Sequence, residues 1–289
     1  MTDAGGTPRG PGPVHRGDVT LKLWGDKTAG EVNDWIYVMS ERIVQMVFSM
    51  PPNGRFTQSD SWKPIYAADE LYYVVDGTLV LANPETGEVV RAEKGEALHF
   101  HQDTWHHGFN SGPGELQILE FFAPASPQRT VAESGDGYGD AKPPLAHWSY
   151  ERNALAGRWP PDGDEHRTRP TIHKVDPLQT LWRVEGEQRR ILVGIMLSTP
   201  GLTAGRIELL PGQSSDLRTH AGDLALFVEH GMLNVLMPDA DTSTRWSELH
   251  PADGFYAPAG TPHRYFNQTG EPVSCLFAVA PSYLPSATP

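Results

Sequence analysis

The two halves of this 289-residue chain carry the same pattern of residues, and this internal repeat limits the possible folds more than any other feature. The segment from Gly95 to Pro124 matches the segment from Ala252 to Pro281 at a constant offset of 157 residues, so that His106 corresponds to His263. Upstream, the run DELYYVVDG matches DLALFVEHG at an offset of 154. A loop that differs by three residues explains the change, because loops absorb such differences at little cost in free energy. The repeat therefore predicts two copies of one fold.

Short apolar or alternating runs, each stopped by turn residues, indicate strands in both copies. The run from Ile43 to Met50 stops at Pro51-Pro52-Asn53-Gly54, and the run from Leu71 to Val75 stops at Asp76-Gly77. Such turns between short runs are typical of antiparallel hairpins. With 29 Gly and 26 Pro the chain is interrupted too often for long helices. The sequence predicts an all-β protein with a sandwich or barrel in each half.

Changes in composition divide the chain into four regions. Trp148 and Trp159 lie in a stretch rich in Pro, Gly and charge. Exposed aromatic side chains are unusual in a free linker, so we expect this stretch to pack across the barrels. The predicted regions are a disordered tail (1–18), a first barrel (19–125), a packed linker (126–175) and a second barrel (176–289).

Charge and cysteine content exclude several classes of protein. The formal net charge is −13, without a basic patch, and such a surface repels both phosphate backbones and anionic lipid. We therefore expect neither nucleic acid nor a membrane as a partner. The single cysteine, Cys275, cannot form an intramolecular disulfide and is predicted to be a small buried apolar residue. Because the sequence contains neither a signal-peptide core nor a run of 18 apolar residues, we expect a cytoplasmic protein.

The spacing of a few residues resembles the two motifs of the cupin superfamily. In the first half, six residues separate Glu70 from Gly77, and Gly95 precedes His106 and Asn110 at the family's spacing. The positions that fit in the second half are Gly212, His220, Gly231, Pro258, Gly260, His263 and Asn267. The resemblance covers most of residues 40–125 and 190–283. It implies two cupin-type barrels in tandem, each a jelly roll or double-stranded β-helix, as in a bicupin.

The resemblance implies a metal site that the first half matches only in part. In metal-binding cupins two histidines, a glutamate and a further histidine point into one barrel, and Glu70 and His106 stand at two of these positions. The stretch Asp60 to Tyr66 replaces the His-x-His pair, with Asp60 as a weak substitute. His99 and His101 lie two apart on an expected strand and so share a face. If that face points inward, one of them completes a two-histidine, one-carboxylate set for a first-row metal; otherwise both are surface or rim residues. The resemblance favours iron, with Mn, Ni or Zn as alternatives.

The second half departs from the motif in a different way. His220 and His263 stand at ligand positions, but Arg218 and Leu224 replace the first histidine and the glutamate. We expect no metal in this barrel, because two protein ligands seldom bind a divalent ion tightly. Arg218 could grip a carboxylate or phenolate beside the two histidines. Alternatively, it turns outward and the barrel is purely structural.

The first barrel could also be reactive without a metal. Burial would disfavour the charged form of Glu70, and beside His106 this carboxyl could serve as a general acid or base. Tyr72 follows Glu70 by two residues and should face the same side. We predict these three residues as catalytic. The predicted substrate contacts are Tyr66, Trp105, Arg218, His220 and His263. For Tyr72 and Trp105 the alternative is plain barrel core.

The leading hypothesis is a metal-dependent enzyme that acts on a small organic molecule, aromatic or carboxylate-bearing, in the first barrel. Oxygenases are prominent among two-barrel cupins, so the resemblance implies a dioxygenase-like oxidoreductase. One alternative is a non-oxidative isomerase, lyase or decarboxylase that uses Glu70 as acid or base. A second alternative is a non-catalytic bicupin that binds a small molecule. The resemblance also implies a homodimer.

Overall fold

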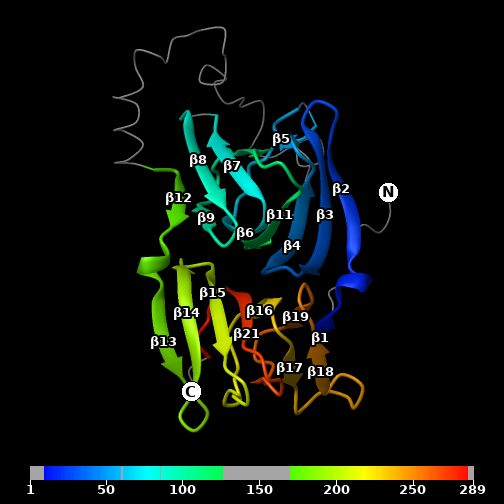
Figure 1. Cartoon of the computed structure of the whole chain (residues 1–289), viewed down its shortest axis with the longest axis vertical. Helices are drawn as coiled ribbons and strands as arrows, with labels where there is room; N and C mark the ends of the chain where they lie inside the picture. Colours follow the sequence, from blue (N-terminus) through cyan, green and yellow to red (C-terminus); the bar gives the residue numbers. More distant parts are fainter. Residues whose placement is uncertain (1–9, 60, 85, 126–169, 286–289) are drawn as a thin grey trace.

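The computed structural model describes residues 10–59, 61–84, 86–125 and 170–285, and these form two β-barrels stacked along the long axis (Figure 1). Within these ranges the regular elements are strands, apart from two 3-10 turns, η1 (Arg16–Asp18) and η4 (Pro177–Gln179). The all-β prediction and the pair of barrels are confirmed. No helix in the described part of the chain is long and apolar enough to span a membrane.

The first barrel combines a seven-stranded sheet in the order β12-β9-β6-β11-β4-β3-β2 with a four-stranded sheet in the order β5-β10-β7-β8. Its strands are β2 (Thr20–Asp26), β3 (Gly30–Met39), β4 (Val44–Met50), β5 (Arg55–Phe56), β6 (Asp69–Asp76), β7 (Thr78–Asn83), β8 (Glu88–Glu93), β9 (Ala97–Phe100), β10 (His107–Asn110), β11 (Leu116–Ala123) and β12 (Ile172–Val175).

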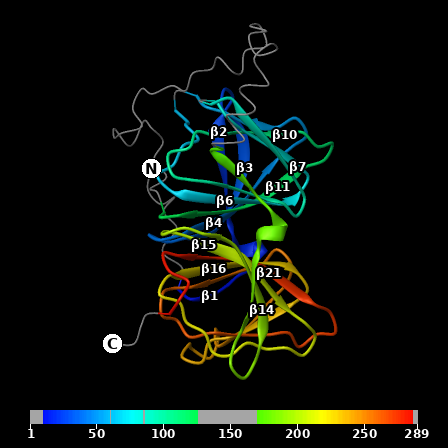
Figure 2. The ribbon, with the colours of Figure 1, turned by 90° about the vertical axis from the view of Figure 1, so that its left-hand side faces the viewer.

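The second barrel repeats this plan with a seven-stranded sheet in the order β1-β19-β16-β21-β15-β14-β13 and a three-stranded sheet in the order β18-β17-β20. Figure 2 shows the two barrels from the side. The strands are β1 (Gly12–Val14), β13 (Leu181–Glu185), β14 (Ile191–Ser198), β15 (Thr203–Leu209), β16 (Asp223–His230), β17 (Leu233–Leu236), β18 (Trp246–Leu249), β19 (Gly254–Ala257), β20 (Arg264–Phe266) and β21 (Val273–Ala280).

The two barrels exchange edge strands, which corrects the predicted domain boundaries. The β1 strand lies in the predicted tail but pairs with β19 of the second barrel, and β12 lies in the predicted linker but pairs with β9 of the first. Both strands are held by backbone hydrogen bonds and by an apolar side chain that becomes buried, Val14 in β1 and Ile172 in β12. Residues 1–9 of the tail, Asp60, and residues 126–169 of the linker with Trp148 and Trp159 lie outside the described residues.

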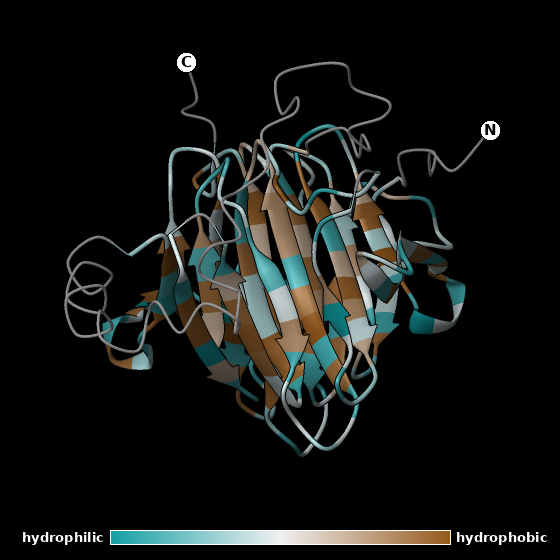
Figure 3. Ribbon diagram, turned by 90° about the horizontal axis from the view of Figure 1, so that it is seen from above, coloured by the Kyte–Doolittle hydropathy of each residue, from teal (hydrophilic) through white to brown (hydrophobic). Residues whose placement is uncertain are grey.

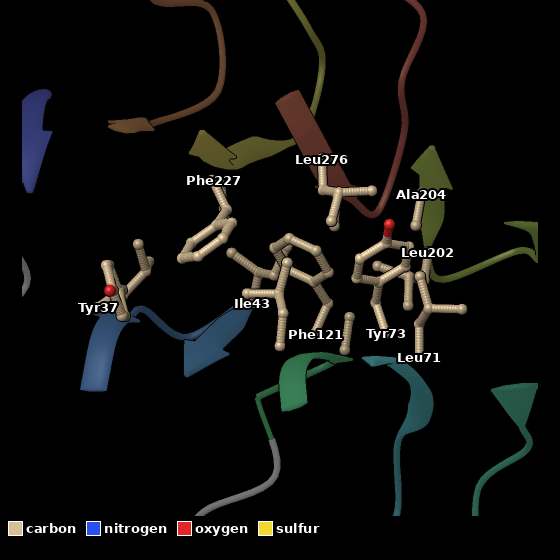
Figure 4. Close-up of a cluster of buried hydrophobic side chains, with 14 of the residues drawn as sticks. Tyr37, Ile43, Leu71, Tyr73, Phe121, Leu202, Ala204, Phe227 and Leu276 are labelled. Atoms are coloured by element: carbon tan, nitrogen blue, oxygen red, sulfur yellow. The ribbon is translucent and has the colours of Figure 1, made fainter. Parts of the chain in front are cut away.

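A shared apolar core joins the barrels. The strands that face each other bury side chains on both surfaces, and on one surface these side chains meet those of the opposite barrel at the junction (Figure 4). The rings of Tyr37 and Phe227 meet edge to face at 5.8 Å between centroids. Leu71, Tyr73 and Phe121 belong to the same core. Seen from above, the strands are largely hydrophobic whereas many connecting loops are polar (Figure 3). This double burial explains why β6 and β11 read as nearly continuous apolar runs.

Candidate active site

The alternation of side chains along β6 and β11 carries polar residues into the first barrel. Leu71 and Tyr73 point toward the second barrel, so Glu70 and Tyr72 point into the first. On the neighbouring strand, Glu120 lies opposite Tyr72 and shares its face. Glu70 is 1% exposed and Glu120 5%. Two carboxyl groups are therefore enclosed in an interior that is otherwise mainly apolar.

Glu70 and Glu120 are in hydrogen-bond contact, and such a bond requires a proton on one of the two carboxyl groups. Burial raises the pKa of Glu70 well above its usual value, and the charge of Glu120 adds to the effect. Burial raises the pKa of Glu120 to about 8, helped by the charge of Asp34. Asp34 is buried on β3, and burial raises its pKa to about 7. We call Glu70, Glu120 and Asp34 the carboxyl cluster; it retains protons near neutral pH.

His106 lies beside this cluster in a defined tautomer. Its Nδ1 is 3.1 Å from the carbonyl oxygen of Thr104, which can only accept, so we assign the proton to Nδ1. Its Nε2 then accepts a hydrogen bond from the hydroxyl of Tyr72 at 3.1 Å. Burial lowers the pKa of His106 to about 3, so the ring is neutral. The same Nε2 lies 3.9 Å from Oε2 of Glu70.

Tyr66 and Trp105 differ in how closely they approach this cluster. The Tyr66 ring lies 6.1 Å from that of His106 and stacks at 5.9 Å on Phe122. Burial and the charges of Glu120 and Glu70 raise its pKa well above the usual value. Trp105 is buried in the connection before β10. The substrate contact proposed for either side chain stays a prediction.

In the second barrel Arg218, His220 and His263 come together as predicted, but Arg218 already pairs with a carboxylate of the protein. Its Nη2 donates to Oε2 of Glu185 at 2.6 Å and to the hydroxyl of Tyr283. The rings of His220 and His263 are 5.5 Å apart, and burial lowers their pKa values to about 4 and about 3. Since Glu185 supplies the counter-charge from the edge strand β13, these contacts favour the structural role over capture of an anionic substrate.

In each barrel the inward histidine accepts a hydrogen bond from a tyrosine hydroxyl, but the two tyrosines stand at different positions of the repeat. His263 donates from Nδ1 to the carbonyl of Thr261 and accepts from the hydroxyl of Tyr265, as His106 does with Tyr72. The tyrosine of the second barrel follows its histidine by two residues on β20. The corresponding residue in the first barrel is Gly108, where a Cβ would lie 2.1 Å from a ring atom of Phe56. The first barrel therefore takes its tyrosine from β6.

The family model described as a cupin domain matches residues 47–122 and 205–279, just over half of the chain and one segment in each barrel. The chain belongs to the cupin family. Comparison with curated protein sequences gives no match.

Solved structures share the whole two-barrel arrangement of this bicupin at low identity. A single-site mutant of Bacillus subtilis oxalate decarboxylase matches with a TM-score of 0.61 and 13% identity, over 96% of this chain and 79% of that one. AerE from Microcystis aeruginosa matches with a TM-score of 0.58 and 8% identity, over 91% and 97%. Protein Ylba from E. coli matches with a TM-score of 0.58 and 11% identity, over 92% and 97%. These likenesses establish the fold alone.

The inward residues of this bicupin do not fit a bound metal ion. A metal would need the Nε2 atom of His106, which already receives the hydroxyl of Tyr72. Burial raises the pKa of both Glu70 and Glu120, so the two carboxyls retain protons near neutral pH instead of presenting two free anions. Among the described residues, the one set of three His, Cys, Asp or Glu donors within 4.8 Å of each other lies elsewhere. We derive no reaction step through a metal in either barrel.

That other set contains His99 and His101. The prediction that one of them completes the inward site is wrong, because neither side chain points into the barrel. His99 lies opposite Leu71 on β6 and is 5% exposed, while its neighbours Leu98 and Phe100 face the barrel interior. His101 has a side chain that is 60% exposed. Both histidines therefore lie on the opposite face of the sheet from Glu70. The strand is too short, and too fully buried, for its sequence to indicate which face is inward.

Sequence reasoning missed Glu120 and Asp34 in the first barrel and Glu185 and Tyr283 in the second. For Glu120 a signal was available, because a charged residue interrupts the apolar strand Leu116–Ala123. A lone carboxyl inside such a strand is rarely buried without a role. Asp34, Glu185 and Tyr283 carry no comparable signal, since each stands in a stretch where polar and apolar residues mix.

Proposed function

We propose that the first barrel of this bicupin catalyses a non-oxidative acid–base reaction on a small organic molecule, of the isomerase, lyase or decarboxylase type. The main support is the buried pair of Glu70 and Glu120. Oε2 of Glu70 lies 3.9 Å from Nε2 of His106, whose ring is neutral. Two adjacent carboxyls, one ionised and one protonated, provide a base and an acid in one place. We prefer this reaction to oxygenase chemistry because the inward donors do not match a metal site.

The pair can move one proton in each direction. The ionised carboxylate removes a proton from a carbon next to a carbonyl, and the electron pair of the broken C–H bond forms the C=C bond of an enol. The protonated carboxyl supplies its proton to the carbonyl oxygen. In an α-hydroxy carbonyl compound the product is an enediol. A proton returns to the former carbonyl carbon while the neighbouring hydroxyl gives its proton to the carboxylate and becomes the new carbonyl, which completes an isomerisation. In a decarboxylation the C–C bond breaks instead, CO₂ leaves, and the protonated carboxyl delivers its proton to the carbon.

The other residues of the set position these groups. His106 accepts the Tyr72 hydroxyl and so fixes the direction of that O–H bond. Because the His106 ring is neutral, it adds no positive charge that would hold both carboxyls ionised. Tyr66 is the partly exposed member of the set, and its ring lies 6.1 Å from that of His106, on the loop between β5 and β6. We expect the substrate to enter past Tyr66. The fold shared with oxalate decarboxylase is compatible with this reaction class.

The test measures deuterium incorporation and CO₂ release from a panel of oxo acids, hydroxy acids and dicarboxylates in D₂O, by NMR. We expect the wild-type protein to act on at least one member. Glu70→Gln and Glu120→Gln should each lower the rate by about 10²- to 10⁴-fold at an unchanged melting temperature. The matched control is Glu93→Gln, whose carboxyl is 56% exposed on β8.

Three outcomes would contradict the proposal. Folded Gln variants that keep the wild-type rate would remove the carboxyl pair from the reaction. A rate that is lost on dialysis against a chelator and restored by a transition metal would favour the metal-dependent hypothesis. A wild-type protein that binds members of the panel but changes none of them would favour the non-catalytic alternative.

A further inference from the structure

A cluster of histidines and an aspartate lies on the face of β6 and β9 that is turned away from the interior of the first barrel. His99 and His101 have ring centroids 4.6 Å apart. His173 on β12 lies 5.9 Å from each of them. Asp69, at the start of β6, accepts a hydrogen bond from Nδ1 of His101 at 3.0 Å. Three strands that are distant in sequence thus bring four metal-binding side chains together.

The donor atoms in this cluster converge on one point. One donor atom each from Asp69, His99 and His101 lies within 4.8 Å of the other two. Ligand atoms bound to the same tetrahedral zinc ion stand about 3.3 Å apart, given Zn–N distances of about 2.0–2.1 Å. The 3.0 Å contact between Asp69 and His101 is already close to that spacing. Since the His101 side chain is 60% exposed, its rotation can supply the remaining approach.

An unpartnered buried atom points to a ligand at this place. Nε2 of His99 is buried and makes no hydrogen bond within the part of the chain that the structure describes. Leaving such an atom without a partner is unfavourable, and coordination of a cation would remove that cost. His99 also faces His173 with nearly parallel rings, 30° between their planes. The His173 ring therefore lies next to that of His99.

The aspartate is held for this role by a residue from the second barrel. Thr199, in the turn between β14 and β15, donates to Oδ2 of Asp69 at 2.6 Å. That bond occupies Oδ2, so Oδ1 is the oxygen that faces the histidines and contacts Nδ1 of His101. Hydrogen bonds of this kind orient metal-binding carboxylates. The cluster therefore lies at the margin of the junction between the barrels.

We propose that Asp69, His99 and His101 bind a divalent transition-metal ion of the zinc or nickel kind, with His173 as a fourth ligand. Two or three imidazoles with one carboxylate form a borderline donor set, which prefers such ions to Mg²⁺ or Ca²⁺. The ion would join β6, β9 and β12, and so hold the exchanged strand β12 to the first barrel. This site is separate from the proposed reaction, because its residues lie on the other face of the sheet from Glu70.

The test is calorimetric titration of ZnCl₂, and separately NiCl₂, into the full-length protein after dialysis against a chelator. We expect one ion per chain with a Kd of about 1 μM or below. At 100-fold excess over that Kd, the melting temperature should rise by about 5 °C. His101→Ala and Asp69→Asn should each weaken binding at least 10-fold. His250→Ala is the matched control, because this histidine is also exposed and also contacts a carboxylate, Glu248 at 3.1 Å.

A second measurement identifies the ligands. X-ray absorption at the zinc edge should show two or three imidazole ligands in the wild-type protein and one fewer in His101→Ala, an exposed position where folding is not at risk. Binding weaker than about 100 μM would overturn the proposal. Equal affinity in His101→Ala and the wild type would do so as well. So would an anomalous-scattering peak at His106 inside the barrel and none at His99.

Discussion

The carboxyl cluster makes a specific prediction about stability and pH. Burial raises the pKa of Asp34 to about 7 and that of Glu120 to about 8. In the unfolded chain these groups titrate near 3.9 and 4.3. Between the unfolded and folded values the folded protein binds more protons than the unfolded chain does. The free energy of unfolding should therefore fall as the pH rises toward 8.

Buried histidines act in the opposite direction, but over a lower pH range. Burial lowers the pKa of His106 and of His263 to about 3 and that of His220 to about 4. An unfolded histidine titrates near 6.5, so these residues bind fewer protons when folded, and stability rises from about pH 3 to about pH 6.5. Above about pH 7.5, where unfolded histidines have also lost their protons, this contribution is constant. The interval from pH 7.5 to 8.5 therefore isolates the carboxyl groups.

The size of the effect follows from these pKa values. Each proton that the folded state retains and the unfolded chain has lost changes stability by about 1.4 kcal/mol per pH unit. Integrated from pH 7.5 to 8.5, Asp34 contributes a loss of about 0.1 kcal/mol and Glu120 a loss of about 0.7 kcal/mol. Glu70, whose pKa is also raised by burial, adds a loss of up to about 1.4 kcal/mol. For a chain of this length the sum, about 2 kcal/mol, corresponds to a fall in melting temperature of about 4 °C.

Urea denaturation and thermal melts at half-unit steps of pH measure this slope. Glu120→Gln should remove about a third of it or more, because an amide cannot ionise. The control is Asp76→Asn, an exposed carboxylate at the end of β6 beside Lys94, which should keep the whole slope. The reasoning fails if wild-type stability is constant or rises from pH 7.5 to 8.5. It also fails if the two variants lose the same fraction of the slope.

Three further changes test the packing. Phe227→Ala opens a cavity between the barrels and should cost about 3–5 kcal/mol in urea denaturation, so a loss below about 1 kcal/mol would contradict the shared core. Gly108→Ala places a Cβ 2.1 Å from an aromatic ring and should cost about 1–3 kcal/mol, whereas Gly114→Ala meets nothing within 4 Å; equal melting temperatures would refute the close approach. Glu185→Gln leaves the Arg218 cation buried without its counter-charge and should cost about 3–5 kcal/mol, and wild-type stability in this variant would show that the pair is dispensable.

The repeat and the local patterns of the sequence determined the two barrels and part of the inward set. Turn residues and apolar runs mark the strands, because both depend on neighbours in the chain. The two-residue period places Glu70 and Tyr72 on one face, and the motif spacing leads to His106, His220 and His263. For these residues the prediction of enclosed positions is confirmed.

Tertiary structure alone decided what these residues meet. Glu120 contacts Glu70 because β11 pairs with β6. Arg218 is not available to an anionic ligand because β13 places Glu185 beside it as a counter-charge. The sequences of the short strands β1 and β12 do not indicate which barrel each strand joins. Their pairing depends on which sheet edge is available in the folded protein. Periodicity reports which side chains share a face. Which face is inward, and which distant strand lies beside it, follows from contacts between residues far apart in the chain.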